Sequence, residues 1–142
     1  MVKVAVVGLG KMGISHLSMV RALPGVEVVG IVDSTGYLLG VLKKYTGLNT
    51  YPSIGKLLEK ERPDAAVVAT PSRLHYPMVR QLLEADVSVF CEKPFTLRAV
   101  DGDELVDLAR SRDSSRRSAT TTGSSGRSPR SSGSWPLEPS VR

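Results

Sequence analysis

Residues 2–13 read VKVAVVGLGKMG, six residues typical of a buried strand followed by a turn with the spacing G-x-G-x-x-G. Apolar residues then recur at three- and four-residue intervals from Met12 to Leu23, so the turn opens a helix. Gly8 permits the tight turn, Gly10 lets the backbone approach a phosphate closely, and Gly13 allows the helix to pack against the strand. The segment therefore predicts a strand, a turn and a helix whose free N–H groups attract an anion.

Asp33 ends the second predicted strand and supplies the acidic partner of this turn. A carboxylate there accepts hydrogen bonds from the adenosine ribose of a dinucleotide. It would repel a 2′-phosphate, and residues 34–36 contain no Arg or Lys, so we expect NAD rather than NADP. Lys11 and Met12 complete the predicted cofactor-binding turn. The alternative is a strand-turn-helix that merely uses glycines, with Asp33 as a solvated strand end.

The rest of residues 1–110 alternates apolar runs of strand length with helical patterns. The predicted strands are Val2 to Val7, Val26 to Val32, Ala65 to Ala69 and Val87 to Phe90, with a short addition at Tyr51; the predicted helices are Met12 to Leu23, Leu38 to Tyr45, Ile54 to Glu61, Tyr76 to Glu84 and Ala99 to Ala109. Apolar strands separated by helices indicate a parallel sheet covered on both faces. We therefore predict an α/β fold with a doubly wound parallel sheet, a Rossmann domain, over residues 1–110.

Two further polar segments follow predicted strands. Thr70-Pro71-Ser72 comes after the strand at Ala65 to Ala69, and Glu92-Lys93-Pro94 comes after the next strand. The carboxyl ends of parallel strands share one edge of the sheet, where open α/β folds bind ligands. Both segments are thus expected in the same crevice as the glycine turn.

These residues together resemble the Gfo/Idh/MocA oxidoreductases. The glycine turn, the acidic strand end, Ala69-Thr70-Pro71 with His75, and the E-K-P segment carry the resemblance. It implies that Lys93 reaches the nicotinamide and a substrate hydroxyl as the catalytic residue. It also implies that Thr70 and Pro71 line the nicotinamide ribose with His75 nearby, and that Glu92 and Pro94 complete the cofactor site. Pro94 would set the turn, with a cis bond as one option.

Plainer roles remain open for several of these side chains. Lys93 could be a solvated loop lysine beside Glu92, and His75 could be a surface or packing residue in the first turn of a helix. His16 is expected to be structural. Cys91, the single cysteine, is expected to be a small core residue rather than a nucleophile. No metal site is expected.

Charge and hydropathy narrow the class of protein. The net charge is +5, but residues 1–110 hold 13 Lys and Arg against 12 Asp and Glu, so the excess belongs to residues 111–142 and argues against nucleic-acid binding. No run approaches the ~18 apolar residues of a membrane span. The first apolar stretch is too short for a secretory signal. A cytoplasmic protein is the expectation.

Residues 111–142 are rich in Ser, Arg, Gly, Thr and Pro, and we expect them to be disordered. One permitted codon choice for residues 112–125, read from the third base of the first codon, encodes GLVTQVGYHNRFV. The same frame then permits GAFPEVKRLLAAGAIGK. These peptides resemble the strand and helix that follow the family's last Rossmann helix. The hypothesis is that this tail is an out-of-frame product of a gene for a full-length enzyme.

The resulting prediction is the cofactor domain of an NAD-dependent oxidoreductase that moves a hydride between nicotinamide and a sugar or cyclitol carbon. The family's second domain, which bears the substrate pocket and the usual oligomer interface, is not recognisable here. The chain alone is therefore expected to bind dinucleotide but turn over poorly. The alternative is a non-catalytic NAD-binding or regulatory protein with a basic interaction tail.

Overall fold

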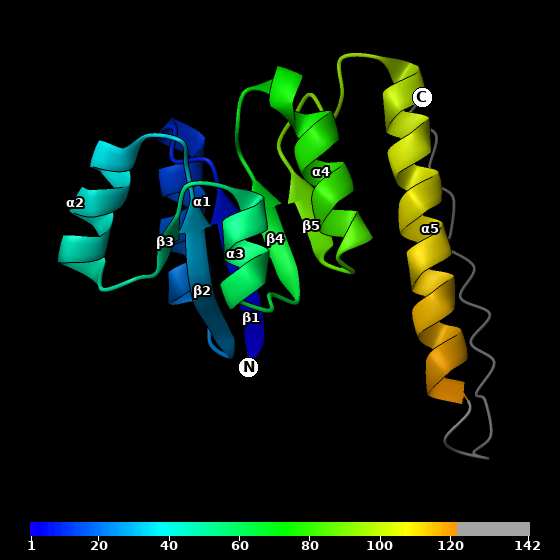
Figure 1. Cartoon of the computed structure of the whole chain (residues 1–142), viewed down its shortest axis with the longest axis horizontal. Coiled ribbons are helices and arrows are strands. Elements are labelled where there is room, and N and C mark those ends of the chain that lie inside the picture. Colours follow the sequence, from blue (N-terminus) through cyan, green and yellow to red (C-terminus); the bar gives the residue numbers. More distant parts are fainter. Residues whose placement is uncertain (122–142) are drawn as a thin grey trace, which may run out of the picture.

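The computed structural model describes residues 1–121 and shows a five-stranded parallel sheet with helices on both faces (Figure 1). The strands are β1 (Val2–Val7), β2 (Val26–Val32), β3 (Thr50–Tyr51), β4 (Ala65–Val68) and β5 (Ser88–Cys91). Their order across the sheet is β3-β2-β1-β4-β5, and every neighbouring pair is parallel. The order reverses between β1 and β4, which opens a crevice at the carboxyl ends of these strands. The predicted doubly wound fold is confirmed.

The helices divide between the two faces of the sheet. They are α1 (Lys11–Ala22), α2 (Gly36–Thr46), α3 (Ile54–Lys60), α4 (His75–Glu84) and α5 (Ala99–Thr121), with a 3-10 turn, η1 (Ser72–Leu74), before α4. Neighbouring residues of β1 alternate between two cores, as the pleat of a strand requires. Val6 packs with Leu17 of α1 and Leu39 of α2. Val7 belongs to the other core, together with residues of α3, α4 and α5.

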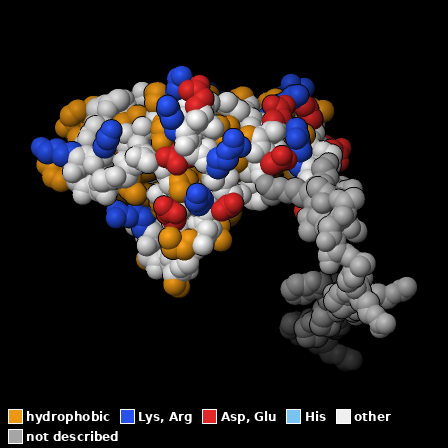
Figure 2. Space-filling model, turned by 60° about the horizontal axis from the view of Figure 1, so that its bottom comes forward, with side chains coloured by type: hydrophobic (Ala, Val, Ile, Leu, Met, Phe, Trp, Pro, Cys, Tyr) orange, Lys and Arg blue, Asp and Glu red, His pale blue; other side chains and the backbone are white. Residues whose placement is uncertain are grey.

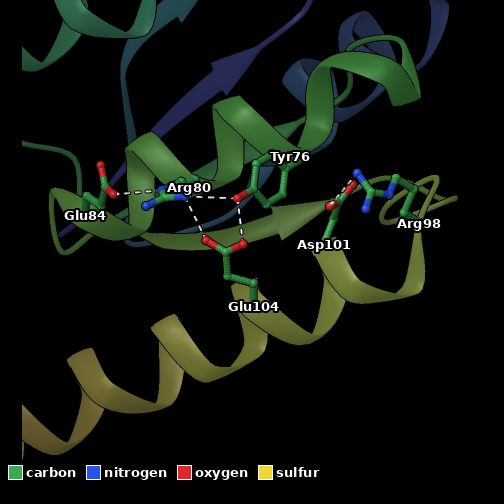
Figure 3. Close-up of polar contacts among 6 residues, drawn as sticks. All are labelled: Tyr76, Arg80, Glu84, Arg98, Asp101 and Glu104. Carbon is green, nitrogen blue, oxygen red and sulfur yellow. Dashed lines mark hydrogen bonds and ion pairs between the residues drawn. The ribbon is translucent and has the colours of Figure 1, made fainter.

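Helix α5 is attached to α4 by one buried side chain and a polar network. Leu105 is only 1% exposed and belongs to the core beneath α4. At the surface, Arg80 of α4 lies 2.7 Å from a carboxylate oxygen of Glu104, and the Tyr76 hydroxyl donates to the other oxygen at 2.8 Å (Figure 3). Exposed ion pairs of this kind contribute little to stability. Burial of Leu105 is therefore the main attachment.

Helix α5 continues to Thr121, beyond the predicted helix end at Ala109 and the expected domain boundary at Arg110. Residues 111–121 contain neither Gly nor Pro, so no strong helix breaker interrupts them. Arg112 also lies 3.6 Å from the Asp86 carboxylate in the turn before β5, an exposed ion pair that adds little to the attachment of the helix. Disorder was expected for residues 111–142; the structure instead places residues 111–121 in α5, and residues 122–142 lie outside the described residues.

The surface of the described chain carries both signs of charge. On the face shown in Figure 2, basic and acidic side chains are interspersed with apolar ones. Within residues 1–121, no helix combines the length and apolar character needed to cross a membrane.

Candidate dinucleotide site

The three glycines of the turn differ in what surrounds them. Gly8 has a φ of +95°, and a Cβ there would lie 2.8 Å from the carbonyl oxygen of Ala69. A Cβ on Gly13 would lie 1.9 Å from the carbonyl oxygen of Gly8, so the helix and the turn could not pack as they do. At Gly10 an added Cβ would meet no heavy atom of the described residues within 4 Å. Gly8 and Gly13 therefore serve the fold, whereas Gly10 leaves open space at the start of α1.

The start of α1 offers donors toward this space. Gly10 is the N-cap, and no side chain of the described residues caps the first turn of the helix. The first N–H groups of an uncapped helix and its positive dipole end favour an anion such as a pyrophosphate. The turn thus fits a phosphate group by both shape and charge.

Asp33 links the end of β2 to the glycine turn. One carboxylate oxygen accepts a hydrogen bond from the Leu9 N–H at 2.8 Å, and the other accepts from the Thr35 N–H at 2.7 Å. Partial burial acts to raise the pKa of Asp33, but these backbone hydrogen bonds outweigh it and hold the pKa below its usual value. The group is therefore a fixed carboxylate at neutral pH, and each oxygen retains acceptor capacity for a hydroxyl.

A pocket at the carboxyl ends of β1, β2 and β4 contains much of the predicted site. Its lining consists of Val7, Gly8, Leu9, Gly10, Val32, Asp33, Ser34, Pro52, Ser53, Ile54, Ala69, Thr70, Pro71, Leu74, Met78 and Gln81. Five predicted cofactor residues are among them: Gly8, Gly10, Asp33, Thr70 and Pro71. The lining does not include the other predicted cofactor residues, Lys11, Met12, Gly13, His75, Glu92, Lys93 and Pro94. Concave shape, apolar walls and a few fixed polar groups suit a small-molecule site.

The E-K-P turn, Glu92–Pro94, follows β5 at the same sheet edge. The Glu92 N–H donates to the Val68 carbonyl at 2.9 Å, so the turn begins beside the end of β4. Lys93 is exposed, and the Lys93–Pro94 peptide bond is cis.

Cys91, the last residue of β5, is not activated as a nucleophile. Burial, followed by the charge of Glu92, raises the pKa of the Cys91 thiol to about 11. Cys91 therefore stays protonated at neutral pH and is a poor nucleophile.

His75 is a buried connection between two turns. Its side chain is among the most buried in the described chain, and the residue is 1% exposed. Nε2 lies 2.8 Å from the Thr70 carbonyl oxygen, and Nδ1 lies 2.9 Å from the Pro94 carbonyl oxygen. The ring thus bridges the segment after β4 and the E-K-P turn.

His16 is the second connection to the E-K-P turn. Its Nε2–H donates to a carboxylate oxygen of Glu92 at 2.5 Å, and its ring packs edge-on against Phe90. The hydrogen bond from His16 lowers the pKa of Glu92, partial burial opposes this, and the Lys93 N–H adds to the lowering. His16 was expected to be structural, and the residue it contacts is Glu92, which was predicted to belong to the cofactor site.

Sequence reasoning missed several residues that line the pocket. Pro52 and Ser53 follow the short strand β3, and the rule that polar turns gather at one sheet edge applies to them as it does to Thr70. Met78 and Gln81 lie three residues apart on α4, so they share one face of that helix. Helical spacing gives no sign that this face borders a pocket rather than the core.

Fold and site together define a dinucleotide-binding Rossmann domain. A model of the Gfo/Idh/MocA group, described as an oxidoreductase family with an NAD-binding Rossmann fold, matches residues 2–117. The chain belongs to this family.

Several similar proteins of known sequence or structure are named as oxidoreductases or dehydrogenases. A putative UDP-kanosamine synthase oxidoreductase subunit from Amycolatopsis mediterranei is 38% identical over 111 residues, which are 78% of this chain and 31% of that protein. Myo-inositol 2-dehydrogenase of Thermotoga maritima is 27% identical, over 78% of this chain and 34% of that enzyme. The WlbA dehydrogenase of Bordetella pertussis, crystallised with NADH and UDP-GlcNAcA, is 27% identical with a TM-score of 0.74, over 79% of this chain and 34% of that one. The chain therefore spans about a third of the length of these relatives.

Proposed function

We propose that this chain supplies the cofactor half of an oxidoreductase that transfers a hydride between NAD and a hydroxyl-bearing carbon of a sugar or cyclitol. The observation that carries the proposal is the Asp33 carboxylate, fixed by the Leu9 N–H beside an uncapped helix start. Relatives named as inositol dehydrogenases, and one crystallised with a nucleotide sugar, support this substrate class. The dinucleotide would supply the hydride chemistry, and the residues of this chain would bind and orient it.

The same carboxylate supports NAD over NADP. Asp33 presents a fixed negative charge at the end of β2, and a 2′-phosphate bound there would face it. Ser34, Thr35 and Gly36 offer no compensating cation. Like charges at close range disfavour binding, so NADPH is expected to bind more weakly than NADH.

Titration of the 142-residue chain with NADH and NADPH, followed by nicotinamide fluorescence, tests both parts. We expect Asp33→Ala to weaken NADH binding by about tenfold to a hundredfold, because hydrogen bonds to a charged group are lost. The preference for NADH over NADPH should shrink in the same variant. Asp64→Ala is the matched control. The Asp64 carboxylate also accepts a hydrogen bond from a backbone N–H, that of Lys3 at 2.8 Å, but it lies at the amino ends of the strands, away from the pocket. Unchanged NADH affinity in Asp33→Ala would remove the ribose assignment.

Lys93 is assigned to the nicotinamide end of the dinucleotide. It stands in the turn that His75 joins to Thr70, and Thr70 lines the pocket. The Lys93 side chain there would contact the carboxamide side of the cofactor and a substrate hydroxyl; its neutral amine would accept a proton from that hydroxyl, and its ammonium form would return one. Lys93→Met is expected to weaken NADH binding while leaving binding of ADP-ribose, which lacks nicotinamide, within about twofold. Equal weakening of both ligands would contradict the assignment.

We also propose that the coding sequence changes frame near codon 111. The support is the composition of residues 111–142 and the family-like peptide that one permitted codon choice encodes in another frame. The substrate-binding part of the enzyme would then be encoded beyond this point in the restored frame.

A further inference from the structure

Both histidines of the chain contact the E-K-P turn or its immediate neighbour. The sequence contains two histidines, and they come from different helices on opposite faces of the sheet. His16 of α1 holds the Glu92 side chain, and His75 of α4 lies against the carbonyl oxygens of Pro94 and Phe95 at 2.9 and 3.3 Å. The turn that carries Lys93 is therefore fixed from both faces.

Each histidine is also connected to the dinucleotide pocket, His16 through the helix that carries it and His75 through a residue that it contacts. Helix α1, which carries His16, begins at the glycine turn. His75 contacts the carbonyl of Thr70, a residue that lines the pocket. A shift of the E-K-P turn relative to the pocket would therefore break a contact at one histidine or the other.

The contacts are of a kind that fixes position. The His16 ring is confined by the edge-on contact with Phe90, whose ring centroid lies 5.6 Å away, and the side chains of His16 and Glu92 are 14% and 20% exposed. A hydrogen bond to a carboxylate in such partial burial is stronger and more directional than one in water. At His75, one ring nitrogen lies against a carbonyl oxygen of each turn, and burial of the ring confines it to the line between the two turns.

We propose that His16 and His75 are positioning residues for Lys93, holding the E-K-P turn so that the ammonium group meets the nicotinamide end of the bound dinucleotide. This inference rests on the proposed function, because it requires a dinucleotide in the pocket. It differs from a general stabilising role, since it acts on one end of the ligand only. The adenosine end is held by Asp33 and the glycine turn, which neither histidine contacts.

The test compares NADH with ADP-ribose on the 142-residue chain. His16→Leu should weaken NADH binding by about fivefold and leave ADP-ribose binding within about twofold. His16→Gln, whose amide can still donate to Glu92, should restore most of the NADH affinity. His75→Gln should show the same selective loss as His16→Leu. Tyr51→Phe serves as the control. It also removes a part-buried hydrogen bond to a carboxylate, that of Glu61 at 2.7 Å, but in β3, the strand farthest from β5 in the sheet.

A double variant separates positioning from mere stability and covers the case in which His75→Gln fails to fold. If His16 acts through Lys93, then His16→Leu combined with Lys93→Met should weaken NADH binding no more than Lys93→Met alone. Equal losses for NADH and ADP-ribose in His16→Leu, or additive losses in the double variant, would overturn the positioning proposal only. Failure of the unmodified chain to bind either ligand would overturn the proposed function, and the positioning role with it.

Discussion

Alanine substitutions at two glycines of the same turn should have different effects: Gly10→Ala should lower NADH affinity, whereas Gly13→Ala should lower stability. Gly10→Ala adds a methyl group where the described residues leave space, and its φ of −65° suits any residue, so stability should change by less than about 0.5 kcal/mol. The methyl group would occupy the position that a pyrophosphate approaches, so NADH affinity should fall by at least about tenfold. Urea unfolding and NADH titration on the same preparation check both statements.

Gly13→Ala is the counterpart, and here the fold itself should suffer. The new Cβ would lie 1.9 Å from the Gly8 carbonyl oxygen, a contact that real structures avoid. The expected loss of stability is about 4 kcal/mol or more, enough to leave much of the chain unfolded. A Gly13→Ala variant that melts like the unmodified chain would contradict the packing described for α1 and β1.

Asp33 should also make stability depend on pH. Its pKa is lowered in the folded chain, since the Thr35 and Leu9 N–H groups outweigh the opposing effect of burial. A lowered folded-state pKa means that the stabilisation is complete above the ordinary aspartate pKa and is lost as the pH falls through the lower folded value. The difference in urea midpoint between the unmodified chain and Asp33→Asn should therefore be largest at neutral pH and shrink in acid. A difference that stays constant into acid would contradict the stated hydrogen bonding.

Helix α5 offers a test of what attaches one element to the rest. Leu105→Ala should cost about 2–5 kcal/mol, because it leaves a cavity in the core beneath α4. Val106→Ala, at a residue that is 41% exposed on the same helix, should cost less than about 0.5 kcal/mol. Thermal unfolding compares the two, and similar losses for both would indicate that the helix is not held by Leu105.

The elements were predictable from sequence to the extent that local pattern specifies them. The strands β1 and β2 match the predicted ranges, because each is an apolar run bounded by turn residues. Gly8, Asp33 and Thr70 could be assigned to one sheet edge, since each follows a strand of a parallel sheet. The contact between His16 and Glu92 joins positions 76 residues apart, and no local spacing signals it. It exists because α1 passes over β4 toward β5, and only the assembled sheet shows that.

At the scale of the described molecule, apolar surface is exposed beside the edge strand β5. β5 is an edge strand that pairs with β4, and Phe90 on it is 57% exposed. A groove on the α1 side of the sheet is lined by Val4, Val20, Leu23, Val26, Ala65, Ala66, Val67, Ser88, Val89 and Phe90. Exposed edge strands and apolar grooves of this kind promote association with other chains. About two thirds of each of these relatives lies outside the matched part, so they have chain available to cover such a surface.

Resequencing the gene around codon 111 tests whether a further domain that would cover this apolar surface is encoded in another frame. We expect a one-base change there to open a long frame that begins with a strand-like and a helix-like peptide. The frame-restored protein should bind less of a hydrophobic dye than the 142-residue chain, because the β5 edge and the groove would be covered. It should also produce NADH from at least one member of a polyol panel, whereas the 142-residue chain should not, since its described residues form the cofactor-binding domain and hold no second domain to position a substrate over the nicotinamide. Absence of any restoring change, or polyol oxidation by the short chain at the rate of the restored one, would show that the tail is the authentic continuation of this domain.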